Sequence, residues 1–422
     1  MTNNSEKKIA IIAGRDPRIA EDTDGGSVFL KYLSAELVNR NNKVDIFTPL
    51  GVTAASFKKE KAEEQLKEKN NEINPKFNHI PLKERSLPVE KGSDYFLRRI
   101  ERSKEVADFF KENSLFNYDL VYVLHLANAF FLVSQNLLPL EKTVFFPMMT
   151  SAHYSIFSEV PEEYTEQEKQ VLSKAKHISS PSSDEIKTII SKFKVGEEKF
   201  FKVHRGFNEN CFPIQKRFEI GAERKLNLFS ANGIRQQKDH LFLIPVVKYL
   251  TEKGFKVKVH LTGNDGKSHN PLYNEYLEKF LKSICSNNLE EEFIIHGVVS
   301  EEEMVFIMSS SDIAVYPSIV ETFGKSVLES VASGLPTVVC KDVPAFLEFI
   351  EHGVTGCITD RNAEDYSKEI IKLWEDPNYY HQISQNGIAL RQKFSWHKVI
   401  NDLLTIQKER GIVFSNQHMR LK

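Results

Sequence analysis

The chain has 422 residues, of which 41% are hydrophobic and 27% are charged, and its formal net charge is -2. This composition is typical of a folded globular protein and excludes the disordered and fibrous classes. The length favours two domains over one. Because the net charge offers no excess of basic residues, nucleic acid is not expected as a partner.

The four cysteines, Cys211, Cys285, Cys340 and Cys357, are scattered without paired spacing. This distribution indicates buried, reduced thiols and not a metal site or a disulfide framework. The polar start of the chain does not resemble a signal peptide. No apolar run approaches the roughly 20 residues that span a bilayer. We therefore expect a cytoplasmic protein that can touch a membrane surface without crossing it.

Short apolar runs rich in β-branched residues alternate with amphipathic stretches along most of the chain. In the first half, the predicted strands are Ile9–Ala13, Val44–Thr48, Leu120–Leu124, Thr143–Pro147, His177–Ser180 and Phe200–His204. In the second half they are Leu226–Ser230, Val257–Thr262, Phe293–Gly297, Ile313–Tyr316, Thr337–Cys340 and Gly356–Ile358. Helical periodicity covers Val28–Arg40, Gln237–Tyr249, Glu301–Ser309 and Gly324–Ala332. Apolar strands separated by helices predict α/β architecture with parallel sheets covered on both faces.

The α/β pattern occurs twice, which predicts two domains. It breaks over Arg205–Glu223, a stretch with several Gly, Asn and Pro residues, and restarts at Leu226. We place the first domain at 1–207, the second at 208–395, and at 396–422 a C-terminal helix that returns to the first domain. Two open sheets of this kind predict Rossmann-like domains that face each other across a ligand cleft.

One stretch rich in Lys and Glu, at about 56–111, departs from the alternation. Apolar residues recur at helical spacing in its last part, from Phe96 to Phe110. We interpret the stretch as a solvated helical insertion on the first domain. A basic amphipathic helix that recognises an acceptor or lies on a membrane surface is the alternative.

The most specific pattern begins at Tyr316 and reads YPSIVETFGKSVLESVASGLP. A predicted strand ends there, Glu321 lies on the following loop, and Glu329 lies on a helix that starts near Gly324. The amides around Gly324 and Lys325 point toward the helix N-terminus, where hydroxyl or phosphate oxygens can bind. One carboxylate can accept hydrogen bonds from sugar hydroxyls while the other accepts from the two hydroxyls of a ribose.

This segment resembles the signature of the retaining glycosyltransferases with the GT-B fold, the family-4 type that includes sucrose-phosphate synthase and many mannosyl- and glucosyltransferases. The resemblance implies that Glu321 binds the donor sugar and that Glu329 binds the ribose. In that family the backbone amides of the adjacent Phe-Gly pair assist in binding the donor, and the resemblance implies this role for Phe323 and Gly324. It further implies transfer of a hexosyl unit from a nucleoside diphosphate sugar, with UDP favoured and GDP open. The acceptor stays open among lipid, glycan, small molecule and protein.

A departing nucleoside diphosphate is negatively charged, so cations are expected beside it. In the stretch from Ser230 to Asp239, Lys238 matches the family lysine. Arg235 lies two positions beyond the place of the family arginine. Arg235 can reach the diphosphate only if the loop follows a different path. The alternative is that Arg235 does not contact the diphosphate.

The first domain contributes further candidates. Gly25 and Gly26 stand where the family places a glycine pair before the first helix, which we expect to start near Ser27. Asp22-Thr-Asp24 does not follow a strand, so we interpret it as loop acids and expect neither a metal nor another cofactor. His153 and His125 both follow predicted strands, and either can face the donor sugar.

The predicted catalytic residues are Glu321, Lys238, Arg235 and His153. By resemblance, the leaving phosphate accepts the proton of the acceptor, and the protein supplies positioning and charge stabilisation. Two alternatives remain open. One is a non-catalytic nucleotide-sugar-binding subunit, which the displaced Arg235 favours, and the other is a different GT-B enzyme such as a phosphorylase or an epimerase.

Overall fold

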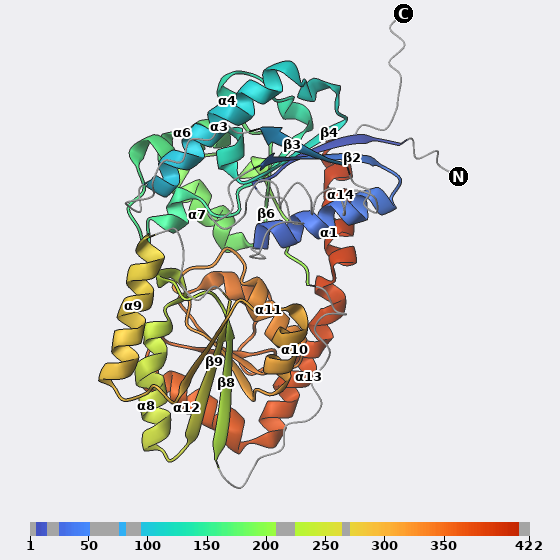
Figure 1. Ribbon diagram of the computed structural model, residues 1–422. Coiled ribbons are helices and arrows are strands. Elements are labelled where there is room, and N and C mark those ends of the chain that lie inside the picture. Colours follow the sequence, from blue (N-terminus) through green and yellow to red (C-terminus); the bar gives the residue numbers. More distant parts are fainter. Residues whose placement is uncertain are drawn as a thin grey trace, which may run out of the picture. The chain divides into compact units, whose positions relative to one another are not determined.

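The structure is a computed structural model that describes residues 6–14, 25–50, 76–81, 94–207, 224–263 and 271–412. The chain divides into two compact units, the first comprising Met1–His204 with Trp396–Lys422 and the second Arg205–Ser395. Each unit contains a parallel β-sheet with helices on both faces (Figure 1). The α/β class and its repetition, both expected from the sequence, are confirmed.

In the first unit, the described residues form a seven-stranded sheet in the order β3-β2-β1-β4-β5-β6-β7, with every neighbouring pair parallel. The strands are β1 (Lys8–Ile12), β2 (Lys43–Leu50), β3 (Lys76–Pro81), β4 (Leu120–Leu124), β5 (Thr143–Phe146), β6 (His177–Ser180) and β7 (Phe200–Lys202). The helices are α1 (Gly25–Asn39), α3 (Asp94–Glu112), α4 (Phe130–Ser134), α5 (Ser151–Tyr154), α6 (Glu162–Lys174), α7 (Ser183–Phe193) and α14 (Trp396–Glu409).

Neighbouring side chains of the central strands enter two different cores. In β1, Ile9 and Ile11 pack with α1 and α14, whereas Ala10 and Ile12 pack with α3, α4 and α6. Successive side chains of a strand point to opposite faces, so a strand covered on both faces must be apolar at every position. This requirement explains the continuous apolar runs in the sequence.

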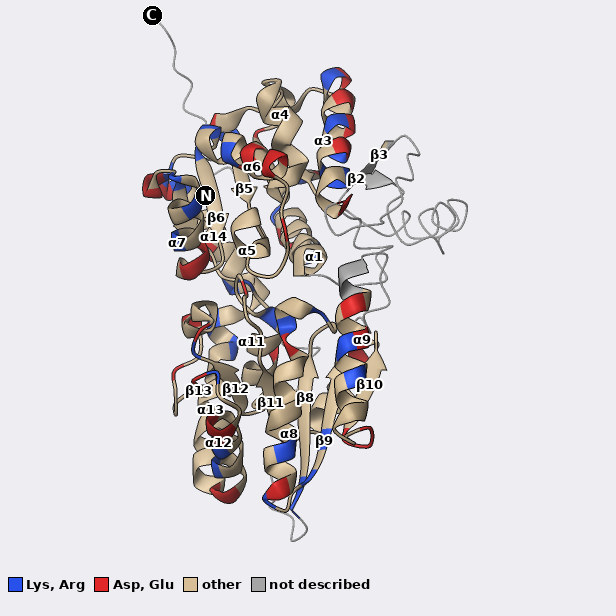
Figure 2. Cartoon of the chain, turned by 90° about the vertical axis from the view of Figure 1, so that its left-hand side faces the viewer, with Lys and Arg blue, Asp and Glu red and all other residues tan. Residues whose placement is uncertain are grey.

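The expected helical insertion at 56–111 is only partly helical. Residues 76–81 form β3, an edge strand that pairs with β2, and 94–112 form α3, while 56–75 and 82–93 lie outside the described residues. The sequence pattern missed β3 because an edge strand tolerates polar residues and a proline, which interior strands of a sheet exclude. α3 carries five acidic and five basic residues along its length, so it is not a predominantly basic helix (Figure 2). Recognition of an acceptor or a membrane surface by this stretch stays a prediction.

The C-terminal helix α14 completes one core of the first unit. Trp396 is buried and its ring stacks on Tyr32 with a centroid distance of 4.9 Å, while Phe29 lies 5.9 Å away. Farther along the helix, Gln407 Oε1 accepts a hydrogen bond of 2.9 Å from the buried hydroxyl of Tyr122 on β4. The helix therefore returns to the first unit, as expected.

The second unit holds a six-stranded sheet among its described residues, in the order β10-β9-β8-β11-β12-β13 and again parallel throughout. The strands are β8 (Lys225–Ala231), β9 (Lys256–Thr262), β10 (Phe293–Gly297), β11 (Ile313–Tyr316), β12 (Thr337–Cys340) and β13 (Cys357–Thr359). The helices are α8 (Leu243–Glu252), α9 (Pro271–Ser286), α10 (Glu301–Ser309), α11 (Lys325–Ala332), α12 (Ala363–Glu375) and α13 (Pro377–Phe394).

The helix expected at Gln237–Tyr249 begins later than the periodicity indicated. Two short 3-10 turns, η5 (Gln236–Lys238) and η6 (His240–Phe242), precede α8. Asp239 separates these turns with a left-handed backbone, at a φ of 49° and a ψ of 46°. The apolar periodicity continues through the turns because their side chains still pack on the sheet, and periodicity alone does not report a local left-handed residue.

Two further expectations concern thiols and membrane spans. Cys340 and Cys357 are buried free thiols, but Cys285 on α9 is exposed, so the prediction of buried thiols is wrong for Cys285. It follows Ile284, which faces the core, and therefore points away from it. Cys211 lies outside the described residues. Among the helices of the described residues, none combines the length and the apolar character that a bilayer-crossing segment requires.

Replacement of Trp396 by Ala removes a buried ring from the core shared by α1 and α14. We expect the free energy of unfolding to fall by about 3 to 5 kcal/mol, because a large cavity replaces aromatic packing. Urea unfolding followed by circular dichroism measures this loss. Phe306, which is 71% exposed on α10, is the control, and Phe306→Ala should change the unfolding midpoint little. Equal effects of the two substitutions would contradict the assignment of α14 to this core.

Candidate active site

The loop between β11 and α11 is anchored at the end of the strand. The buried Tyr316 hydroxyl lies 2.8 Å from Ser330 Oγ and donates to the carbonyl oxygen of Ser326 at 3.0 Å. The backbone N–H of Tyr316 donates to the hydroxyl of Tyr366 at 3.0 Å. The hydroxyl contacts join the end of β11 to α11, and the bond to Tyr366 joins it to α12. The two ends of the intervening loop, residues 317–324, are therefore held in place.

Gly324 forms the turn into α11. Its φ is 88°, in the left-handed region that favours glycine. A Cβ atom at this position would lie 2.6 Å and 2.9 Å from two ring carbons of Phe346, closer than real Cβ atoms approach carbon. The backbone therefore enters the helix along a path open only to glycine, and the amides that follow belong to the first turn, where helical partners are lacking.

Glu321 on this loop pairs with Lys238 at the end of η5. The two side chains form an ion pair although 83 residues separate them in the sequence, and the residues are only 8% and 7% exposed. Ser318 Oγ donates a second hydrogen bond, of 2.9 Å, to the same carboxylate oxygen. Because β8 and β11 are neighbours in the sheet, the segments that follow their carboxyl ends meet at one edge. The structure thus brings together two of the predicted catalytic residues.

The main chains that carry this ion pair are also bonded to each other. The N–H of Ile319 donates to the carbonyl oxygen of Gln237 at 2.9 Å, and the Gln237 side chain donates to the carbonyl oxygen of Val320 at 3.1 Å. Gln237, the neighbour of Lys238, is therefore bonded to the loop that holds Glu321. The relative position of the two charged groups is set by backbone geometry as well as by their attraction.

A second positive charge, that of Arg235, acts on Lys238. Burial lowers the pKa of Lys238, the carboxylate of Glu321 opposes this effect, and the charge of Arg235 reinforces it. His240 is fully buried, and within the part of the chain that the structure describes neither ring nitrogen has a hydrogen-bond partner. Burial and the charges of Lys238 and Arg235 lower its pKa to about 3, so His240 is neutral at pH 7. The charge of Arg235 thus lowers the pKa of both Lys238 and His240, although Arg235 is displaced from the family position in the sequence.

Glu329 lies on the first turns of α11 with its own cationic partner. It is 8% exposed and forms an ion pair with Lys325, one helical turn earlier. On the adjacent residue, Ser326 Oγ donates to Asn232 Oδ1 at 3.2 Å, which ties the helix to the segment after β8. The Asn232 side-chain nitrogen is buried and has no hydrogen-bond partner among the described residues. The first turns of α11 thus carry a buried carboxylate, and the same helix is bonded to a residue with a buried amide donor.

The histidine candidates lie in the first unit. His153 on α5 is buried, with Nδ1 3.1 Å from Thr150 Oγ1 and Nε2 without a hydrogen-bond partner within the described ranges. Burial lowers its pKa to about 4, so the ring is neutral at pH 7. His125 directly follows β4 and has a left-handed backbone with a φ of 68°. Both histidines therefore stand after carboxyl ends of strands of the first sheet.

The glycine pair of the first unit sits differently from its expected place. Gly25 and Gly26 are the first two residues of α1, so they do not precede the helix as predicted from a start near Ser27. Periodicity of apolar residues marks only the buried part of a helix and misses a first turn made of glycine. Asp22-Thr-Asp24 lies outside the described residues.

Sequence comparison places most of the second unit in a known group. Residues 214–390 match the family described as "Glycosyl transferases group 1". An uncharacterized glycosyltransferase of Methanocaldococcus jannaschii is 23% identical over 227 residues, covering 52% of this chain and 56% of that protein. Mannosylfructose-phosphate synthase of Agrobacterium fabrum is 25% identical over 217 residues, covering 49% and 47%. The matched region thus spans about half the length of these relatives.

Solved structures resemble the whole chain in fold. Sucrose-phosphate synthase from Thermosynechococcus elongatus superposes with a TM-score of 0.75 at 16% identity, covering 96% of this chain and 99% of that one. A glycosyltransferase from Rickettsia africae gives 0.69 at 16% identity, covering 98% and 100%. An Anabaena protein solved with UDP and glucose gives 0.65 at 15% identity, covering 96% and 100%. The fold is therefore that of the GT-B glycosyltransferases.

Gly324→Ala should destabilise the second unit. A left-handed residue with a Cβ costs about 1 to 2 kcal/mol, and displacement of Phe346 adds to this cost. Thermal unfolding measures the effect as a lowered midpoint. Gly25→Ala is the control, since a Cβ at Gly25 meets no atom of the described residues within 4 Å, and its midpoint should not fall. Equal midpoints for the two variants would show that the turn into α11 accepts other residues.

Proposed function

We propose that this protein, whose residues 214–390 belong to the group 1 glycosyltransferases, is an active glycosyltransferase that moves a hexosyl unit from a nucleoside diphosphate sugar with retained configuration. The observation that carries the proposal is the buried Lys238–Glu321 pair at the carboxyl ends of β8 and β11, with Glu329 on the following helix. We favour UDP over GDP because structures with the same fold were solved with UDP and a sugar.

Glu321 is proposed to bind the sugar. One of its carboxylate oxygens already accepts from Lys238 and Ser318, and we assign the second oxygen to hydroxyls of the donor sugar. Charged hydrogen bonds of this kind stabilise a bound group more than neutral ones. With Lys238 and Ser318 holding one oxygen, the carboxylate is oriented before the sugar arrives, and less ordering is needed on binding.

Lys238 and Arg235 are proposed to stabilise the departing diphosphate. An anion beside Lys238 favours its charged form and so opposes the effect of burial on its pKa. The first-turn amides of α11 around Gly324 and Lys325 add donors without a counter-charge. The charge that develops on the leaving group would then be met by cations and dipoles that are already in place.

Glu329 is proposed to accept hydrogen bonds from the two ribose hydroxyls, while Lys325 orients its carboxylate. We further propose that His153, neutral at pH 7, faces the donor sugar from the first unit. Gly25 and Gly26, at the start of α1, would then let backbone amides approach the phosphates. The reaction needs no cofactor, and the cytoplasmic location expected from the sequence stays a prediction.

A panel of UDP- and GDP-sugars, incubated with the protein and analysed by mass spectrometry, tests the proposed reaction. Release of nucleoside diphosphate from one donor class, faster when an acceptor is supplied, is the expected result. A non-catalytic subunit would bind donors without releasing the nucleotide, and that outcome would overturn the enzyme proposal. Products that form only when inorganic phosphate is present would point instead to a phosphorylase.

Alanine substitutions separate the proposed roles of the two carboxylates. Glu329→Ala should weaken nucleoside diphosphate binding by about tenfold or more, because a charged hydrogen bond contributes roughly 1.5 to 3 kcal/mol. Glu321→Ala should lower kcat by at least as much while the Kd of the nucleoside diphosphate alone changes little. Calorimetry and the release assay measure the two quantities. Glu302, exposed on α10, is the control, and its replacement should change neither. Identical behaviour of all three variants would show that the site lies elsewhere.

A further inference from the structure

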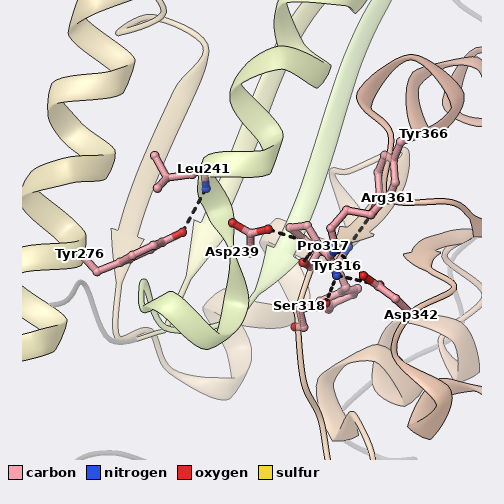
Figure 3. Close-up of polar contacts among 9 residues, drawn as sticks. All are labelled: Asp239, Leu241, Tyr276, Tyr316, Pro317, Ser318, Asp342, Arg361 and Tyr366. Carbon is pink, nitrogen blue, oxygen red and sulfur yellow. Dashed lines mark hydrogen bonds and ion pairs between the residues drawn. The ribbon is translucent and has the colours of Figure 1, made fainter. Parts of the chain in front are cut away.

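Arg361, just after β13, binds the segments that follow three other strands of the second sheet, two of which belong to the candidate site (Figure 3). Its guanidinium donates to the carbonyl oxygens of Pro317 and Ser318 at 2.7 and 2.6 Å. It forms a two-pronged ion pair with Asp342, at 2.6 and 2.9 Å, and a further bond of 3.1 Å to Asp239. These partners belong to the segments that follow β11, β12 and β8.

Two of these partners lie directly beside the buried ion pair. Asp239 is the residue after Lys238, and its left-handed backbone turns the chain there. Ser318 offers its carbonyl oxygen to Arg361 and its hydroxyl to Glu321. A single guanidinium therefore bonds to both chain segments that carry the charged pair. It bonds to Asp239, the residue next to Lys238, and to Ser318, which also bonds to Glu321.

The chemistry of this junction requires arginine. Nε, Nη1 and Nη2 all donate, and the planar group addresses two carbonyl oxygens and two carboxylates in different directions. A lysine has three donors on one atom and cannot reproduce that fork. Asp239 is partly buried, and burial raises its pKa while Arg361 lowers it. Loss of the guanidinium would leave this carboxylate and two carbonyl oxygens without their strongest donor.

We propose that Arg361 is a positioning residue of the donor site, which sets the distance between Lys238 and Glu321 by holding their loops together. This inference rests on the proposed glycosyltransferase function and deepens it. Arg361 acts through Asp239 and Ser318 and has no assigned contact with the donor. Small errors in the placement of reacting groups are costly, since a shift of about 1 Å can reduce a rate on the order of 100-fold.

Arg224, whose side chain is more exposed and makes fewer hydrogen bonds than that of Arg361, provides a control within the same unit. It donates to the carbonyl oxygen of Lys253 and to the carboxylate of Glu375, both at 3.1 Å, and lies 4.9 Å from the ring of Phe255. It thus makes the same kinds of bonds as Arg361. However, it directly precedes β8, at the opposite end of the strand from Lys238. A general loss of an arginine network should therefore affect both variants alike.

The test compares Arg361→Ala, Arg361→Lys and Arg224→Ala in the full chain. Hydrogen exchange of the peptide covering 317–324 should accelerate in both Arg361 variants and stay unchanged in Arg224→Ala. In the donor-release assay, both Arg361 variants should lose about 10- to 100-fold in kcat with less than a threefold change in donor KM. The kcat of Arg224→Ala should match that of the unmodified protein.

Two results would overturn the proposal. One is unchanged exchange at 317–324 in the Arg361 variants, and the other is a kcat that falls equally in Arg224→Ala. If the unmodified protein releases no nucleoside diphosphate from any donor, the proposed function fails. The exchange comparison then decides alone whether Arg361 holds the loop, so the two failures are distinguishable.

Discussion

Two opposite charges that lie together away from water depend on each other, because removal of one leaves the other uncompensated at a cost of about 3 to 5 kcal/mol. Lys238 and Glu321 are such a pair, and the surrounding structure is arranged around them. The sheet order places β8 beside β11, backbone bonds link the two loops, and Arg361 joins both to β13. A parallel sheet supplies this setting because the segments after its strands collect at one edge.

The grouping of candidate residues on one strand–loop–helix segment was predictable because its signal is local. Glu321, Gly324 and Glu329 lie within nine residues of one another, on a strand–loop–helix segment whose apolar strand and helical period are evident. The two sheets were predictable for a related reason, since strands buried on both faces cannot alternate with polar residues. The edge strand β3 was not predicted because an edge strand does not need to be apolar at every position.

The residues that the sequence patterns missed are those whose interactions are with residues far away along the chain. Arg361 bonds to Asp239 and Ser318, which are 122 and 43 residues away along the chain. Nothing in the residues around position 361 reports those contacts. His240 stands two positions after Lys238, yet only the structure shows that burial and the charges of Lys238 and Arg235 lower the pKa of its ring. A sequence pattern identifies candidate residues that lie on one segment. Only the tertiary structure shows which distant residues bond to them.

The first unit is discontinuous in sequence, and this bears on how the chain folds as it is made. Trp396 and the rest of α14 cover a face of the first sheet that α1 covers only in part. A chain emerging from the ribosome adds roughly 5 to 20 residues per second, and domains fold as units once complete. The second unit, 205–395, is therefore complete before the first, whose apolar face waits for the last helix. During that interval the nascent chain exposes the apolar face that α14 later covers, and exposed apolar surface of this kind favours aggregation.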